Sequence, residues 1–211
     1  MKLYTWLSAP NPRRAKIFVA EKGIDIEIVE ASDPDNPGQL SAEYCKKYLH
    51  QRVPLLELDD GSCIGEAAAI CRYLETVYPE NPLMGRTPKE AAIVEMWDRI
   101  AEWEGMMAVS EVFRNTHHLF EGRGLAGYDI DIPQIPELAE RGELRLGRFF
   151  EKIDKHLAEH EFLPGDAFSF ADITAMCAID FGISRRLPFP GSCSNVQRWH
   201  EAISARQSAQ V

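Results

Sequence analysis

Positive charge is scarce in this sequence. Its 211 residues include 23 Lys and Arg against 33 Asp and Glu, and the formal net charge at pH 7 is −10. Proteins that bind phosphate backbones need a basic surface, so we expect no nucleic-acid partner. Long apolar runs are also missing, since none approaches the roughly 20 residues that span a bilayer and the N-terminus lacks the apolar core of a signal peptide. We therefore expect no membrane partner.

Cysteine is sparse and unpatterned. The five cysteines are an odd number, form no CxxC pair and do not cluster in the sequence. A disulfide framework or a cysteine zinc site needs paired spacing, so we expect small apolar side chains in a reducing compartment. This usage predicts a cytoplasmic protein. The other proportions, 45% apolar, 27% charged and 9% aromatic, are those of a globular chain that can form one large or two small domains.

The first eighty residues carry the pattern of an α/β domain. Residues 24–29 alternate apolar and acidic side chains with period two, as a half-buried strand does. Residues 14–22 have helical apolar spacing and end at Gly23, a favourable left-handed cap. The turn signal Asp59–Gly61 separates two short apolar runs, which predicts an antiparallel hairpin. With a strand over 2–6 and helices over 41–48 and 66–77, the expected order is β-α-β-α-β-β-α.

The remainder of the chain is expected to be helical. Residues 79–88 contain three prolines and a glycine, which indicates a linker. Residues 88–115 then have apolar side chains at spacings of three and four, which predicts one long amphipathic helix. Further helices are expected over 137–160, 169–185 and 195–206, with a loop over 122–136. The predicted domains are an N-terminal domain over 1–80, a linker over 81–88 and an all-helical domain over 89–211.

Residues 50–75, HQRVPLLELDDGSCIGEAAAICRYLE, combine features of a ligand site. The Val53-Pro54 pair opens the hairpin, and an X-Pro bond in a tight turn can be cis, which leaves the preceding backbone groups facing a ligand. Glu66 then stands at the start of an alanine-rich helix. A carboxylate beside a helix N-terminus can hold an α-amino acid, because the acid binds the ammonium while the N–H groups and the dipole bind the carboxylate.

A second motif lies about a hundred residues downstream. In FLPGDAFSFADITAM, Ser169 and Asp172 have the spacing of a capping box, in which the serine accepts from the helix backbone and the acid reaches back to the cap. LPGD followed by SxADI resembles a signature of the C-terminal domain of glutathione transferases, and VP…DG…E…AI..YL resembles the glutathione-binding half of the same family. The sequence thus resembles soluble, cytosolic-type bacterial glutathione S-transferases over essentially its whole length. The resemblance implies an N-terminal thioredoxin-like domain followed by an all-helical domain.

The resemblance also implies a glutathione-binding role for four residues of the first motif. Val53, ahead of a cis Pro54, would pair its backbone with the cysteinyl unit, and Glu66 and Ala67 would hold the γ-glutamyl end. Family members usually have Ser or Thr at the position of Ala67. One hydroxyl contact is therefore missing, and we expect weaker glutathione binding and not its loss.

Two further residues, Gln51 and Arg52, stand where other members of the family contact the glycyl carboxylate. A guanidinium suits that anion. An ordinary surface loop is the alternative for both residues.

The turn Ser8-Ala9-Pro10-Asn11 follows the first strand, where a thioredoxin-like domain carries a redox CxxC. Neither Ser8 nor Asn11 is a cysteine, so thiol–disulfide exchange through a protein thiol is not expected. A hydroxyl and an amide at a helix N-terminus can instead donate hydrogen bonds to the glutathione thiolate. Ser8 resembles the serine of one group of the family and Asn11 the asparagine of a bacterial group. We favour Ser8, with a purely structural helix cap as the remaining alternative.

Two other patterns are set aside. His156 and His160 fit the HxxEH zinc motif, but a catalytic zinc needs a third protein ligand, and the helix explains both side chains. Residues 122–127 fit GxGxxG but follow a helix instead of a strand, which indicates a loop. We therefore expect no metal.

The function implied by the resemblance is attack of the glutathione thiolate on a hydrophobic electrophile, a detoxification reaction with glutathione as co-substrate. A homodimer formed through the long helix from Pro88 is also implied. A non-catalytic glutathione-binding or structural protein, and a glutathione-dependent disulfide reductase or peroxidase, are the alternatives. Candidate residues for the electrophile pocket, for which core packing is the alternative, are Trp6, Trp103, Met106, Met107 and Phe113.

Overall fold

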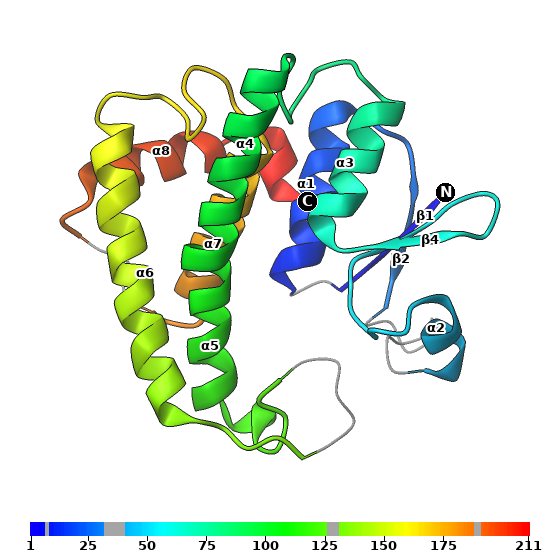
Figure 1. Cartoon of the computed structure of the whole chain (residues 1–211), viewed down its shortest axis with the longest axis horizontal. Coiled ribbons are helices and arrows are strands. Elements are labelled where there is room, and N and C mark those ends of the chain that lie inside the picture. The colour runs from blue at the N-terminus through cyan, green and yellow to red at the C-terminus, as the bar shows by residue number, and fades with distance from the viewer. Residues whose placement is uncertain (7–8, 32–40, 126–130, 188–190) are drawn as a thin grey trace. The chain divides into compact units, whose positions relative to one another are not determined.

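The computed structural model describes residues 1–6, 9–31, 41–125, 131–187 and 191–211 (Figure 1). Contacts divide the chain into two compact units, Met1–Pro82 with Val211, and Leu83–Gln210. The first unit is a small sheet with helices and the second is helical, which confirms the predicted fold class. Among these residues, no helix combines the length and the apolar character needed to cross a bilayer.

A four-stranded sheet in the order β2-β1-β3-β4 organises the first unit. Its elements are β1 (Lys2–Thr5), α1 (Pro10–Lys22), β2 (Glu27–Glu30), α2 (Ala42–Lys47), β3 (Leu55–Glu57), β4 (Cys63–Gly65) and α3 (Ala67–Val77), in the predicted order. β1 pairs parallel with β2 and antiparallel with β3, and β4 returns antiparallel beside β3. β2 covers less than the alternating 24–29 pattern and starts later, because β1 pairs only with Glu27 to Glu30.

Strand alternation supplies an apolar surface to both faces of the sheet. Tyr4 and Leu55 form one buried cluster with Tyr44 of α2. Leu3 and Leu56 occupy the next register positions, so they point to the opposite face, and both are fully buried. α1 and α3 pack against each other and against β1 and β3 (Figure 1). The unit is therefore a layered α/β structure with the strand ends free to carry a site.

The second unit is built on a long central helix made of the consecutive segments α4, η1 and α5. Its elements are α4 (Pro88–Ile100), η1 (Ala101–Met106, a π-helix), α5 (Met107–Thr116), η2 (His118–Phe120, a 3-10 turn), α6 (Pro136–Leu157), α7 (Phe170–Ser184), α8 (Ser194–Ser204) and η3 (Gln207–Gln210, a 3-10 turn). α6 packs along α5, and α7 packs against η1 and α4 (Figure 1). α7 is apolar around most of its circumference and buried along most of its length, as is typical of a helix in the core of a helical domain.

The predicted single helix over 88–115 differs from the structure at η1. Gly105 lies in this π-helical segment, and a Cβ there would come within 3.0 Å of the Phe149 ring and 3.2 Å of the Ala178 Cβ. The segment therefore packs closely against both α6 and α7. Apolar spacing predicts helix here but cannot distinguish a π-helical turn from an α-helical one, because the difference is in the backbone hydrogen bonds.

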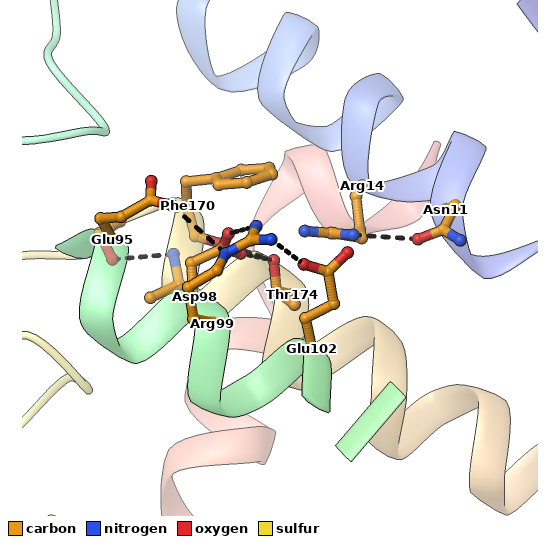
Figure 2. Close-up of polar contacts among 10 residues, drawn as sticks. Asn11, Arg14, Glu95, Asp98, Arg99, Glu102, Phe170 and Thr174 are labelled. Carbon is orange, nitrogen blue, oxygen red and sulfur yellow. Dashed lines mark hydrogen bonds and ion pairs between the residues drawn. The ribbon is translucent and has the colours of Figure 1, made fainter. Parts of the chain in front are cut away.

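A buried acid links α4 to α7. Asp98 has no exposed surface, and Thr174 donates its Oγ1 hydrogen to Asp98 Oδ1 at 2.5 Å (Figure 2). Arg99 adds an ion pair to the same carboxylate and a second one to Glu102 at 2.5 Å. A buried carboxylate is tolerated only with such partners. Sequence patterning did not identify Asp98, because its partner Thr174 is far away in the chain.

Two glycines of α6 provide a matched test of this packing. A Cβ on Gly142 would lie 2.8 Å from the Ala108 carbonyl oxygen of α5, whereas nothing lies within 4 Å of a Cβ on Gly147. We expect Gly142→Ala to lower the free energy of unfolding by about 1–3 kcal/mol, because the backbone of α5 cannot move aside. Gly147→Ala should raise it by about 0.5–1 kcal/mol, because alanine favours helix.

The measurement is chemical denaturation of both variants beside the unsubstituted protein. If Gly142→Ala were as stable as Gly147→Ala, the close approach of α5 and α6 would be disproved.

Candidate active site

The β3–β4 hairpin brings the two halves of the first motif together. The Val53-Pro54 bond is cis, and β3 starts at the next residue. Leu55 pairs with Gly65, so continuing the antiparallel register places Pro54 opposite Glu66. The N–H and C=O of Val53 form no hydrogen bond with another described residue, and they remain available to a ligand. A backbone segment with free hydrogen-bonding groups and a carboxylate thus meet at one end of the β3–β4 pair.

Glu66 adopts a backbone conformation that is rare for a side-chain-bearing residue. Its φ is +66° and its ψ is 123°, and α3 begins immediately after it at Ala67. Its side chain makes no capping hydrogen bond to α3. The N–H groups of the first helical turn have no partner within the helix. A strained residue that holds its carboxylate beside free N–H groups is a typical sign of a binding site.

Tyr48, which sequence analysis did not single out, supports Glu66. Its hydroxyl donates to Glu66 Oε1 at 3.2 Å. The ring lies against Gly65, where any Cβ would collide with it. Burial and the neighbouring Glu66 charge raise the pKa of Tyr48, so the phenol stays protonated and keeps donating at neutral pH. The glycine before Glu66 is the only sequence signal for this contact.

A second tyrosine of the same region holds the loop before Val53. The hydroxyl of Tyr44, buried in α2, donates to the Arg52 carbonyl at 2.7 Å. The Gln51 N–H donates to the Tyr48 carbonyl at 3.1 Å, and Gln51 has a φ of +53°. These hydrogen bonds to α2 and its C-terminal cap therefore fix the backbone of Gln51 and Arg52, the two residues predicted to contact the glycyl carboxylate.

The predicted thiol partners are placed as follows. Ser8 lies outside the described residues. Asn11 lies in the first turn of α1, after Pro10, and its Oδ1 accepts from Arg14 Nη1 at 3.0 Å (Figure 2). The N-cap residue is Ala9, and among the described residues no side chain caps this helix. Because Arg14 occupies the oxygen of Asn11, the amide N–H₂ is the end left for an acceptor.

The predicted electrophile-pocket residues of the helical unit differ widely in exposure. Trp103 is 62% exposed and Met106 only 2%. Phe113 does line a cavity of about 360 Å³ in the helical unit, at the C-terminal ends of α5 and α7. Its described lining residues, most of which sequence analysis missed, are Val112, Phe113, Thr116, His117, Ser184, Arg185, Arg186 and Leu187.

The predicted capping box at the start of α7 is present. Asp172 accepts from the Ser169 N–H at 3.0 Å and from the Ser169 hydroxyl at 2.9 Å. Its other oxygen accepts from the Leu163 N–H at 2.9 Å and from Trp199 Nε1 at 3.0 Å. One carboxylate therefore joins the start of α7 to α8 and to the preceding loop. Burial raises the pKa of Asp172 to about 6, although these four donors oppose the shift.

The histidine pattern set aside above has an ordinary structural role at His156. His156 Nε2 contacts the Leu163 carbonyl oxygen at 2.8 Å, and its ring packs 4.3 Å from that of Trp97. Within the described part of the chain, no group of three or more His, Cys, Asp or Glu side chains could hold a metal ion. The end of the GxGxxG string, residues 126–127, lies outside the described residues.

The fold and this site together define a two-domain protein with a thioredoxin-like unit and a helical unit. Residues 1–76 match the family described as Glutathione S-transferase, N-terminal domain, and residues 105–207 match Glutathione S-transferase, C-terminal domain. Glutathione S-transferase 2 of Saccharomyces cerevisiae is 30% identical, over 99% of this chain and 87% of that protein.

Two solved bacterial structures agree with this match. A glutathione S-transferase domain-containing protein of Marinobacter aquaeolei is 34% identical, with a TM-score of 0.87 over 99% of each chain. A glutathione S-transferase of class Gtt2 from Vibrio parahaemolyticus is also 34% identical, with a TM-score of 0.82 over 100% of this chain and 96% of that one. The chain belongs to the glutathione S-transferase family, which confirms the resemblance seen in its sequence.

The Asp172 network leads to a stability prediction. In Asp172→Asn an amide N–H₂ replaces one acceptor oxygen, so donors that meet at this carboxylate lose their partner. We expect the free energy of unfolding at pH 5 to fall by about 2–4 kcal/mol. The exposed Asp166, in the preceding loop, provides the control Asp166→Asn, which should change it little.

The difference in the free energy of unfolding between the unsubstituted protein and Asp172→Asn should depend on pH in a defined direction. The pKa of Asp172 in the folded protein, about 6, lies above its ordinary value of 3.8, so the folded state binds the proton more tightly. Its contribution is complete below pH 4 and decreases as pH rises through about 6. The gap between the unsubstituted protein and Asp172→Asn should therefore be larger at about pH 5 than at about pH 7.5. A gap that widened on raising the pH would contradict this assignment.

Proposed function

We propose that this protein is a glutathione transferase that activates the thiol of glutathione for attack on a hydrophobic electrophile. The observation that carries the proposal is the register of the β3–β4 hairpin, which aligns the Val53 backbone with the Glu66 carboxylate and the N-terminus of α3. The Val53 N–H and C=O would pair with the cysteinyl unit. Glu66 would take the ammonium of the γ-glutamyl end, and the Ala67 N–H would donate to its carboxylate.

The glycyl end of glutathione would lie toward Gln51 and Arg52. The Arg52 guanidinium can form a bidentate contact with a carboxylate. The hydrogen bond from Tyr44 to the Arg52 carbonyl supports this role, because it restricts the loop before a ligand arrives.

Asn11 or Ser8 would stabilise the thiolate. For Asn11 the support is its contact with Arg14, which orients the amide and, being cationic, makes the free N–H₂ a better donor. The thiol loses its proton to solvent, the sulfur forms a bond to the electrophilic carbon, and the leaving group departs with the bonding electrons. Pre-oriented donors beside the developing anion supply the stabilisation that this step needs.

A homodimer is the second part of this proposal. Large apolar side chains are exposed along the central helix at Met96, Trp103 and Met107, seven and four residues apart, and Leu144 of α6 is 72% exposed. Exposed apolar side chains at helical spacing favour a protein interface. Detoxification in the cytoplasm is the expected role and agrees with five free cysteines.

Thiolate absorbance of bound glutathione, followed across about pH 5 to 10, tests the chemistry. We expect the pKa of the bound thiol to lie about two units below its solution value, which corresponds to about 2.7 kcal/mol. Asn11→Ala and Ser8→Ala, compared singly, identify the donor, because only its loss should return the pKa toward the solution value. If the bound thiol kept its solution pKa, the transferase proposal would fail, and the protein would bind glutathione without activating it.

Glutathione affinity, measured by calorimetric titration, tests the binding residues separately. Glu66→Gln should weaken binding by about tenfold to a hundredfold, because an ammonium loses a charged partner. Tyr48→Phe should weaken it by about two- to tenfold, because Glu66 loses its supporting donor. Tyr73→Phe in α3 is the control and should have no effect. Neither Glu66→Gln nor Tyr48→Phe should shift the pKa of the bound thiol, whereas loss of the thiolate donor should. If Glu66→Gln bound glutathione as tightly as the unsubstituted protein, this site would be excluded.

A further inference from the structure

The cavity at the C-terminal ends of α5 and α7 differs in charge from the rest of the protein. Two of its lining residues, Arg185 and Arg186, are cationic, and none of the described lining residues is acidic. The protein as a whole has a formal charge of −10. The charge of the cavity lining is therefore opposite in sign to that of the whole protein.

Neither arginine side chain is neutralised within the described residues. Arg185 Nε is buried and has no hydrogen-bond partner. No ion pair joins Arg185 or Arg186 to a described carboxylate, whereas the buried Asp98 is paired with Arg99. Both side chains therefore keep an uncompensated positive charge at the cavity, and an anionic ligand that pairs with them would gain affinity.

Two aromatic rings, Phe113 of the cavity lining and its neighbour Phe181, pack against the Arg185 guanidinium. Its Cζ lies 4.1 Å from the centroid of the Phe113 ring and 5.3 Å from that of Phe181, and the two rings meet edge to face at 5.4 Å. Stacking orients a guanidinium without neutralising it, and its N–H groups stay in the plane for a bidentate acceptor. The Phe113 ring beside it offers an apolar surface to a flat ligand.

The two hydroxyl groups that line the cavity are less suited to hold an anion. The hydroxyl of Ser184 donates to the Phe181 carbonyl and that of Thr116 to the Val112 carbonyl, both at 2.7 Å. These hydroxyls therefore present lone pairs to the cavity. The lining side chains that can donate to an anion are the two arginines and His117, whose Nδ1 accepts from the Leu119 N–H at 3.3 Å.

Arg186 adds a second argument. Its φ is +61°, just after the end of α7, where glycine or asparagine is usual. An arginine costs stability at this position, so its presence indicates a role for the side chain.

We propose that this cavity binds the acidic group of an aromatic organic anion, so that the electrophiles preferred by the protein are aromatic compounds carrying a carboxylate or sulfonate. Arg185 binds the acid in its plane, Arg186 strengthens the positive potential, and Phe113 packs against the ring. The inference rests on the proposed function for the reaction of the bound anion, but not for its binding. At about 360 Å³ the cavity is within the size range of small-molecule sites.

The test uses two electrophiles that differ only in charge, 4-chloro-3-nitrobenzoate and 4-chloro-3-nitrobenzamide. In both, the glutathione sulfur bonds to the ring carbon and chloride leaves with the electron pair. Each kcat/KM is divided by the rate with free glutathione, which removes the difference in intrinsic reactivity. We expect the benzoate to be preferred by about tenfold or more. The double variant Arg185→Gln/Arg186→Gln should lose this preference while the benzamide rate stays within about twofold.

Control variants separate the site from the general charge and from folding. Arg148→Gln, on the exposed surface of α6, removes one positive charge elsewhere and should leave the preference unchanged. Arg186→Gln alone, at an exposed position, is used if the double variant does not fold, and it should reduce the preference. Equal loss of both rates, or a preference unchanged in these arginine variants, would overturn the proposal.

Binding without glutathione distinguishes failure of this inference from failure of the proposed function. Fluorescence titration with 2-naphthoate and 2-naphthamide should show tighter binding of the acid, and the double variant should remove the difference. If neither electrophile reacts but naphthoate binds selectively, the transferase proposal fails and the anion site stands. If the acid and the amide bind equally, the anion site is excluded whatever the rates.

Discussion

The antiparallel pairing of β3 with β4 is the constraint on which the candidate site depends. Because Leu55 lies opposite Gly65, the residues flanking this pair, Pro54 and Glu66, face each other, and the backbone of Val53 comes within reach of the same ligand as the Glu66 carboxylate. A slip of one residue would reverse the faces of Leu55 and Leu56, expose apolar surface and separate these groups. The hydrophobic core of the sheet and the geometry of the site are therefore maintained by the same register.

The short helix α2 stabilises the groups that this register aligns. Tyr44 is buried against the sheet and donates to the Arg52 carbonyl, while Tyr48, at the end of the helix, donates to Glu66. The conformation of Glu66, with a φ of +66°, needs such support, because an isolated residue would relax from it. In the proposed site, α2 would thus contribute to binding through the residues that it holds, without itself presenting a ligand group.

The helical unit is likewise organised by buried polar groups. Asp172 joins the start of α7 to Trp199 of α8, and Asp98 joins α4 to Thr174 in the second turn of α7. With one end of α7 fixed by these contacts, its other end presents Arg185 and Arg186 at the cavity. The proposed division of labour follows from this arrangement: the thioredoxin-like unit recognises the common thiol peptide, and the charge at the end of α7 selects among electrophiles.

The sequence by itself determined the order of elements, the capping box and the cis-proline motif, because turns, caps and X-Pro bonds depend on residues within a few positions of one another. It also predicted the family, since two such local motifs occur at the family's spacing. Tyr48, the π-helical turn at Ala101–Met106, and the Arg185 cavity were decided only by the tertiary structure. Tyr48 is recognisable only once β4 brings Glu66 beside it, and Arg185 only once α5 and α7 place Phe113 against its guanidinium. The physical reason is that these interactions join residues distant in the chain, and their geometry exists only after the elements have packed.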